Sequence, residues 1–321
     1  MSKAPEQLTN RSFTDNGITP HLALLAVQVM FGTWPIFGKI VLRSMSSTSL
    51  VGLRVCGAAL VLTLFRRQFG RLLRLPRRIL AWVVLSSLLG VVLNQLLFVK
   101  GLSFTTAINA SLITTTIPVF TIAVSIALGH DRASLRHVLG IGLAAAGVIY
   151  LVDPLRASFT AQTTLGNILI VINSFAYGAY IAVSRDLFRR YGALDVITWI
   201  FLIGAIITLP FAGFTWTGDE LGDVSWRTWL IVAYIIIVPT VAAYYLNAWA
   251  VIRVSPSIVA VYVYLQPLLA FGFAPMILGE SWNSRTLVAC ALIFAGVGVV
   301  TIYSRSRAEE EVSEHPGASA H

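Results

Sequence analysis

Cysteine, histidine and charged residues are all scarce in this chain of 321 residues. Its two cysteines, Cys56 and Cys290, lie inside apolar stretches, so the sequence offers neither a disulfide framework nor the spacing of a metal site. Charged residues make up 12% of the chain, whereas a soluble domain usually has about twice that share. The chain therefore has too few charges to cover the surface of a soluble domain of this length.

Long apolar runs take the place of the missing charges. Hydrophobic residues make up 57% of the chain, and the mean hydropathy is +0.80. A run of roughly 17 to 25 apolar residues can cross a bilayer core of about 30 Å, and it must do so as a helix because lipid offers backbone groups no partner. We expect an all-α membrane protein with ten transmembrane helices, near residues 20–42, 48–65, 79–99, 106–128, 136–152, 163–184, 193–213, 227–249, 257–278 and 286–303.

The distribution of basic residues predicts the orientation. Sixteen Lys and Arg residues lie in the two ends and in the loops on the same side, six of them between the second and third runs, against six on the opposite side. Cytoplasmic loops carry such an excess, so we expect both termini in the cytoplasm and the protein in the plasma (inner) membrane. The loops also account for the net charge of +9, and we expect no nucleic-acid partner.

A repeat divides the chain into halves. The runs at 113–129 and 262–279 each contain a proline, Pro118 and Pro267, 149 residues apart. Five runs per half is an odd number, so the halves enter the membrane from opposite faces, as in many transporters. The predicted organisation is a cytoplasmic N-terminal segment, two inverted five-helix repeats and a disordered cytoplasmic tail, at residues 1–19, 20–152, 163–303 and 304–321.

These features together resemble an EamA-type member of the drug/metabolite transporter superfamily. The resemblance rests on the ten runs, the repeat, the aromatic–Gly starts "FGTWPIFGK" (31–39) and "YGAYIAVSR" (177–185), and "LGE" (278–280). It implies two inverted five-helix bundles around a central cavity, without cofactor, metal or catalysis. Bacterial exporters of neutral amino acids are the nearest comparison, but members of the superfamily also carry purines, polyamines, nucleotide sugars and drugs. The first half departs from the pattern, with "LGHDR" (128–132) where the family usually has Gly-Glu.

The central cavity is predicted to be uncharged. No Asp or Glu lies in the middle of a run, so the usual proton carrier of an antiporter is missing, and we expect facilitated or weakly coupled transport. Lys39, Lys100 and Arg253 lie near helix ends, and Arg54, about six residues into the second run, is expected to extend to the interface as well. The cavity should therefore suit a neutral or zwitterionic solute.

Polar and aromatic residues supply the candidate solute site. Tyr177 and Tyr180 share a helix face with Asn173, and their repeat partners in the first run are aromatic too. The alternative is that such residues only join helices by hydrogen bonds or form aromatic belts at the interfaces. The candidate solute-binding residues are Phe31, Trp34, Asn94, Gln95, Asn109, Tyr177, Tyr180, Tyr244, Asn247, Trp249, Tyr262 and Gln266.

The sequence predicts a secondary transporter that works by alternating access and exports amino acids. A carrier of drugs, amines or nucleobase-like solutes is the alternative, and a membrane enzyme is a remote one, because no histidine or acid lies mid-membrane. Small residues of the fifth and tenth runs, such as Gly147 and Gly298, predict close helix contacts within the bundle or between two protomers. We expect a monomer or a weak homodimer.

Overall fold

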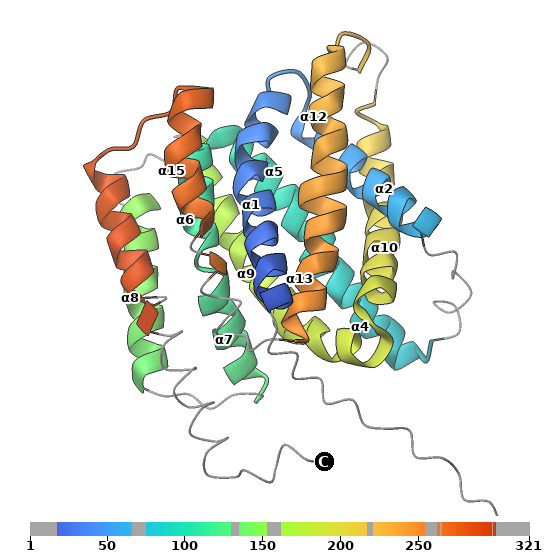
Figure 1. Ribbon diagram of the computed structural model, residues 1–321, viewed down its shortest axis with the longest axis horizontal. Coiled ribbons are helices and arrows are strands. Elements are labelled where there is room, and N and C mark those ends of the chain that lie inside the picture. The colour runs from blue at the N-terminus through green and yellow to red at the C-terminus, as the bar shows by residue number, and fades with distance from the viewer. Residues whose placement is uncertain are drawn as a thin grey trace, which may run out of the picture.

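The computed structural model describes residues 18–65, 75–129, 135–152, 162–216, 221–253 and 262–299, except 264 and 297, and its regular structure over these ranges is helical (Figure 1). The predictions for the N-terminal segment and the tail fall almost wholly outside the described residues. The helices are α1 (Ile18–Val41), α2 (Ser47–Phe65), α4 (Arg77–Ser87), η1 (Leu88–Leu93), α5 (Asn94–Phe104), α6 (Ala107–Thr114), α7 (Ile117–Ala127), α8 (Leu135–Val152), α9 (Gln162–Tyr191), α10 (Ala193–Gly213), α12 (Trp226–Ile236), η2 (Ile237–Ala242), α13 (Ala243–Val251) and α15 (Leu265–Leu278).

The predicted class, an all-helical membrane protein, is confirmed. Seven stretches of the described chain are long and apolar enough to cross a bilayer: Thr19–Val41, Ser47–Phe65, Arg77–Phe104, Ala107–Ala127, Gln162–Tyr191, Ala193–Gly213 and Trp226–Val251. Shorter apolar helices lie where the fifth, ninth and tenth crossings are predicted, at Val138–Leu151, Leu265–Leu278 and Ser284–Gly296. The count of ten crossings stays a prediction.

The sequence predicted one continuous helix for the fourth apolar run, but the structure has two, α6 and α7. Helix α6 ends at Thr114, and α7 begins at Ile117 with Pro118 in its first turn. The hydroxyls of Thr114, Thr115 and Thr116 donate to the carbonyls three residues earlier. Proline has no N–H to continue the helical ladder, and the threonine hydroxyls satisfy carbonyls at the break instead.

Helix α1 lies between two groups of helices, as Figure 1 shows, with α15 and α6 on one side and α12 and α13 on the other. Helix α9 packs against α5 and α7, and α2 packs against α10. Gly147 of α8 meets the helix Ser284–Gly296, because a Cβ added at Gly147 would lie 2.8 Å from a side-chain carbon of Ile293. The predicted small-residue contact of the fifth and tenth runs is therefore made within the chain.

Two short π-helices interrupt the third and eighth apolar runs at equivalent positions. Each residue of η2 lies 149 residues after its counterpart in η1, which is the offset of the sequence repeat. Pro239 of η2 lacks an N–H, and its counterpart in η1 is Gly90. A π-helix widens the turn, weakens the backbone ladder and often marks a functional site. Both segments supply carbonyls to the candidate site.

Candidate functional site

A buried arginine occupies the centre of the bundle. Arg54 of α2 is 2% exposed, and its guanidinium donates through Nε to Thr240 Oγ1 (2.6 Å), through Nη1 to Gln95 Oε1 (2.6 Å) and through Nη2 to the carbonyl of Pro239 (3.3 Å). Its guanidinium carbon lies 3.9 Å from the centre of the Trp34 ring. The prediction that Arg54 extends to the membrane interface is therefore wrong.

The face of α2 on which Arg54 lies explains this direction. Val51, Val55, Ala58 and Leu62 of the same helix are all buried, and their spacing places them beside Arg54 on the side that packs into the bundle. A side chain on this face has no lipid-facing path to the interface. The helix face on which Arg54 lies, and not its depth in the membrane, decides where the guanidinium is placed.

Gln95 connects Arg54 to Tyr244 and so links α2, α5 and α13. The Gln95 side-chain amide accepts from Arg54 and donates through Nε2 to the Tyr244 hydroxyl at 3.2 Å. That hydroxyl in turn lies within hydrogen-bond distance of two acceptors, the Gly90 carbonyl of η1 at 3.2 Å and Asn94 Oδ1 at 3.1 Å. Gln95 and Tyr244 are also repeat partners, 149 residues apart, and they meet at the centre of the molecule.

Aromatic rings surround the Tyr244 ring. The ring centres of Phe31 and Tyr177 each lie 6.0 Å from that of Tyr244, in edge-to-face arrangements, and the Tyr180 ring lies 5.3 Å from Tyr177. Gly90 is required here, because a Cβ at this position would overlap the Tyr180 ring. Edge-to-face rings attract each other beyond the apolar area that they bury. The cluster is therefore a rigid apolar wall beside the Arg54 network.

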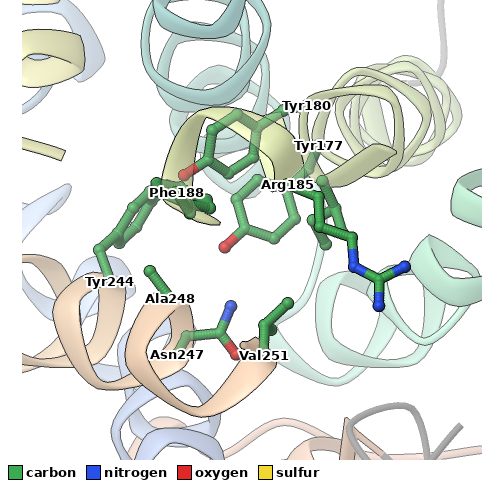
Figure 2. Close-up of a pocket in the computed structure, with 9 residues that line it drawn as sticks. Tyr177, Tyr180, Arg185, Phe188, Tyr244, Asn247, Ala248 and Val251 are labelled. Atoms are coloured by element: carbon green, nitrogen blue, oxygen red, sulfur yellow. The ribbon is translucent and has the colours of Figure 1, made fainter. Parts of the chain in front are cut away.

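A pocket opens on the other side of these tyrosines, between α9 and α13 (Figure 2). Its empty space is about 310 Å³, including the part that is open to solvent. In Figure 2 the Asn247 amide points into the space between the two helices, and the Arg185 guanidinium points away from it. The lining residues are Tyr177, Tyr180, Ile181, Arg185, Phe188, Tyr244, Asn247, Ala248 and Val251. The pocket thus opens towards the last turns of α9 and α13, with the tyrosines at its inner end.

Polar contacts join helices at the opposite end of the bundle. The Glu280 carboxylate, just after α15, accepts from the backbone N–H groups of Ala107 (2.8 Å) and Ile108 (3.1 Å) in the first turn of α6. The hydroxyl of Thr105 donates to Asn167 Oδ1 at 2.5 Å and ties the end of α5 to the start of α9. A carboxylate at a helix N-terminus is favourable for both its charge and its hydrogen bonds.

The structure brings eight of the twelve candidate residues together. Contacts among aromatic rings, Arg54 and the Gln95 network join seven of them, and the eighth, Asn247, lines the pocket with Tyr244; the eight are Phe31, Trp34, Asn94, Gln95, Tyr177, Tyr180, Tyr244 and Asn247.

The other four candidates have different partners. Asn109 lies in the first turn of α6, where its backbone N–H is capped by a threonine hydroxyl. Trp249 lies under the Arg253 guanidinium in the last turn of α13. Tyr262 pairs with the His21 ring, and Gln266 pairs with Gln28 across α1 and α15, as the sequence alternative of helix-joining hydrogen bonds expects.

Sequence reasoning missed Arg54, Thr240 and Phe188 as parts of this region. Arg54 had a visible signal, since it is a lone charge within an apolar run. Thr240 and Phe188 had none, because a threonine and a phenylalanine are ordinary in apolar helices. Among the described residues, no group of three or more His, Cys, Asp or Glu side chains could hold a metal ion.

Comparison with known proteins finds a family match over most of the chain. The EamA-like transporter family matches residues 18–152 and 164–302. An uncharacterized transporter of Archaeoglobus fulgidus is 29% identical over 68% of this chain and 76% of its own length. The uncharacterized transporter YetK of Bacillus subtilis is 24% identical over 88% and 86%, and the uncharacterized inner membrane transporter YedA of Escherichia coli is 25% identical over 87% and 90%.

The fold also matches a solved crystal structure. The match has a TM-score of 0.60 at 19% sequence identity and covers 89% of this chain and 99% of the other. At this level of identity the likeness concerns the fold alone.

Proposed function

The chain belongs to the EamA-like transporter family, and on that premise we propose that it is a secondary transporter that exports a small zwitterionic metabolite, an amino acid, by alternating access. The observation that carries the proposal is the contrast between the two ends of the central aromatic cluster. On one side of Tyr244 lies an open pocket, and beyond the cluster the bundle is closed by Glu280. A site accessible from one side only is what alternating access requires.

Symmetry supports the two inverted repeats of the proposal, with boundaries at residues 20–152 and 163–303 and ten crossings in all. The π-helices η1 and η2 are 149 residues apart, and the repeat partners Gln95 and Tyr244 touch. An internal two-fold relation brings equivalent residues together near its axis. The Gln95–Tyr244 contact is therefore where such an axis would pass, and the central cluster lies on it.

The chemistry of the pocket supports a solute with an apolar side chain and a polar end. Tyr177, Tyr180 and Phe188 supply rings, and the Asn247 amide supplies a donor and an acceptor. Most small-molecule sites combine an apolar lining with a few orienting polar groups. The wider proposal is that Gln95 and the other predicted polar residues of the cluster bond the polar end once the solute has passed the tyrosines.

The proposed orientation places both termini in the cytoplasm and the pocket on the cytoplasmic side of the inner membrane. The last turn of α9 contains Arg189 and Arg190, and α13 is followed by Arg253, so the pocket opens at an end rich in basic residues. In this orientation the structure is an inward-facing state, ready to take up its solute from the cytoplasm.

Transport by the purified protein in proteoliposomes tests the proposal. Labelled neutral amino acids should cross the membrane down their gradient, and unlabelled amino acid should compete. Because no acid lies in the middle of an apolar run, an imposed proton gradient should drive little or no uphill movement. A panel of amines and nucleobases is the control. Movement of those solutes without amino acids would contradict the proposed substrate, and strong proton-driven accumulation would contradict the proposed coupling.

A further inference from the structure

In the part of the chain that the structure describes, Arg54 is a charge without a counter-charge. Its partners are an amide oxygen, a hydroxyl, a backbone carbonyl and an indole ring, supplied by Gln95, Thr240, Pro239 and Trp34. All four are neutral, and among the described residues no carboxylate forms an ion pair with it. These groups give each guanidinium nitrogen one hydrogen-bond acceptor, but none of them carries a negative charge.

The position of Arg54 makes this arrangement costly. Thr240, to which it donates, is the fifteenth of the 26 residues of the span Trp226–Val251, so the guanidinium lies near the middle of the membrane. An arginine at this depth usually pairs with an acid or lines a pathway, because taking a charge out of water without a partner is unfavourable. Hydrogen bonds to neutral groups do not by themselves explain why a charged guanidinium lies at this depth.

Arg54 lies directly behind the inner end of the pocket. Tyr244 lines the pocket, its hydroxyl accepts from Gln95, and Gln95 accepts from Arg54. Two side chains, those of Tyr244 and Gln95, therefore separate the pocket from the charge. The repeat partner of Arg54, 149 positions later, is Ile203, so the second half of the chain has no charge at the equivalent position. The site therefore has a positive charge from the first half alone.

We propose that Arg54 binds a carboxylate group of the transported solute. The inference rests on the proposed transport function and narrows its substrate class to solutes with a carboxylate and an apolar or aromatic side chain. A guanidinium presents paired N–H donors that match the two oxygens of a carboxylate. In the bound state the carboxylate would replace Gln95 Oε1 and the Pro239 carbonyl on Nη1 and Nη2, while Thr240 continues to hold Nε.

The surrounding groups favour a carboxylate over a phosphate. A phosphate carries up to two charges and is normally held by several cations. No second basic side chain joins Arg54 in the network that the described residues form. The stacked Trp34 ring, which itself lies 5.8 Å from the Phe98 ring, offers an apolar surface beside the bound carboxylate.

Three probes that share one aromatic ring test the assignment: L-phenylalanine, 3-phenylpropionate, which lacks the amine, and 2-phenylethylamine, which lacks the carboxylate. Their binding to the purified full-length protein is measured by calorimetry and by the shift in melting temperature. The variants are Arg54→Gln, Arg54→Lys and, as a matched loss of one exposed charge, Arg227→Gln. Folded yield is measured on each preparation by size-exclusion chromatography.

We expect the wild-type protein to bind the two carboxylates and not the amine. Arg54→Gln should weaken carboxylate binding by about tenfold or more, as the loss of a charged hydrogen bond does. The affinity of Arg54→Lys should lie between those of the wild type and Arg54→Gln. Arg227→Gln should bind like the wild type. If Arg54→Gln does not fold, the preference for carboxylate over amine in the wild type still decides.

The inference is overturned if the wild-type protein binds the amine as well as the carboxylates, if it binds none of the three probes, or if folded Arg54→Gln binds them with unchanged affinity. Transport of the same probes into proteoliposomes separates this result from the proposed function. Arg54-dependent binding without movement would contradict transport and leave the carboxylate site standing. Movement of the amine alone would contradict the carboxylate site and leave transport standing.

Discussion

The two ends of the helix bundle are held together by different kinds of contact. At one end a carboxylate and a hydroxyl make short, directional hydrogen bonds between segments far apart in sequence, from Glu280 to α6 and from Thr105 to Asn167. At the other end α9 and α13 face each other across a pocket lined largely by aromatic and aliphatic side chains, among them Tyr180 and Phe188. The first end, called the fastened end below, is joined by a few hydrogen bonds. At the second end, ring and aliphatic side chains line the space between α9 and α13.

This difference teaches how the molecule could change state. A few directional bonds can be lost together, whereas ring packing can tighten gradually as two helices approach. Opening the fastened end would cost the bonds of Glu280 and Asn167, and closing the pocket would return part of that cost as ring contacts and buried apolar area. The central network around Arg54 and Gln95 lies between the two ends.

The largest expected effect concerns which end faces the cytoplasm. On a background without cysteines, a cysteine at Gly218 should react with an impermeant reagent in intact cells, and one at Gly70 should react only after the cells are opened. The basic-residue count predicts this result, since residue 70 lies in the arginine-rich segment. The opposite pattern would place the pocket on the outer face and reverse the proposed direction.

The second effect concerns the fastened end. Glu280→Gln removes the charge on the α6 N-terminus, a contact worth about 0.5–2 kcal/mol, and should favour opening by roughly two- to thirtyfold. Ser111, one turn into α6 and 1% exposed, is a suitable reporter as a cysteine. On the cysteine-free background, the rate at which Ser111→Cys reacts with an impermeant maleimide should rise by that factor when Glu280→Gln is added.

Asp223→Asn is the matched control, because Asp223 is an exposed carboxylate in the segment before α12, at the same end of the bundle. It should leave the labelling rate unchanged. An equal rise in both variants would mean that charge in general, and not the cap on α6, controls access. No change with Glu280→Gln would show that this end is held by other contacts.

Much of the fold could be predicted from the sequence because each apolar run has to be a helix in lipid. Most helices begin and end close to the predicted limits, but α9 continues to Tyr191, beyond the predicted end at residue 184. The break at Thr115 and Thr116 and the two π-helices were not predicted, because they depend on which backbone carbonyl finds a partner. A hydropathy pattern carries no information about that choice.

The candidate site was predicted in part, for reasons of helix geometry. Tyr244 and Asn247 are three residues apart and share a face, whereas Trp249 is five residues from Tyr244 and points elsewhere. Gln266 lies on a helix that packs against the far side of α1, which no spacing within its own segment reveals. Arg54 was misplaced because its depth was considered and its helix face was not. Gln95 and Tyr244, which the sequence repeat aligns, are in contact in the structure, but an alignment of repeats does not predict contact.

The smallest expected effect concerns the pocket between α9 and α13, which aromatic rings line. Tyr180→Ala removes a ring that packs between Tyr177 and the Gly90 backbone and lines the pocket. An aromatic contact is worth about 0.5–1.5 kcal/mol beyond lost area, so the affinity for an aromatic solute should fall by a few-fold to about tenfold. Tyr150→Ala removes an exposed ring and is the matched control. Affinity and folded yield are measured on the same preparation. A lower yield with unchanged affinity would make Tyr180 a packing residue, and the open end would then hold no part of the solute site.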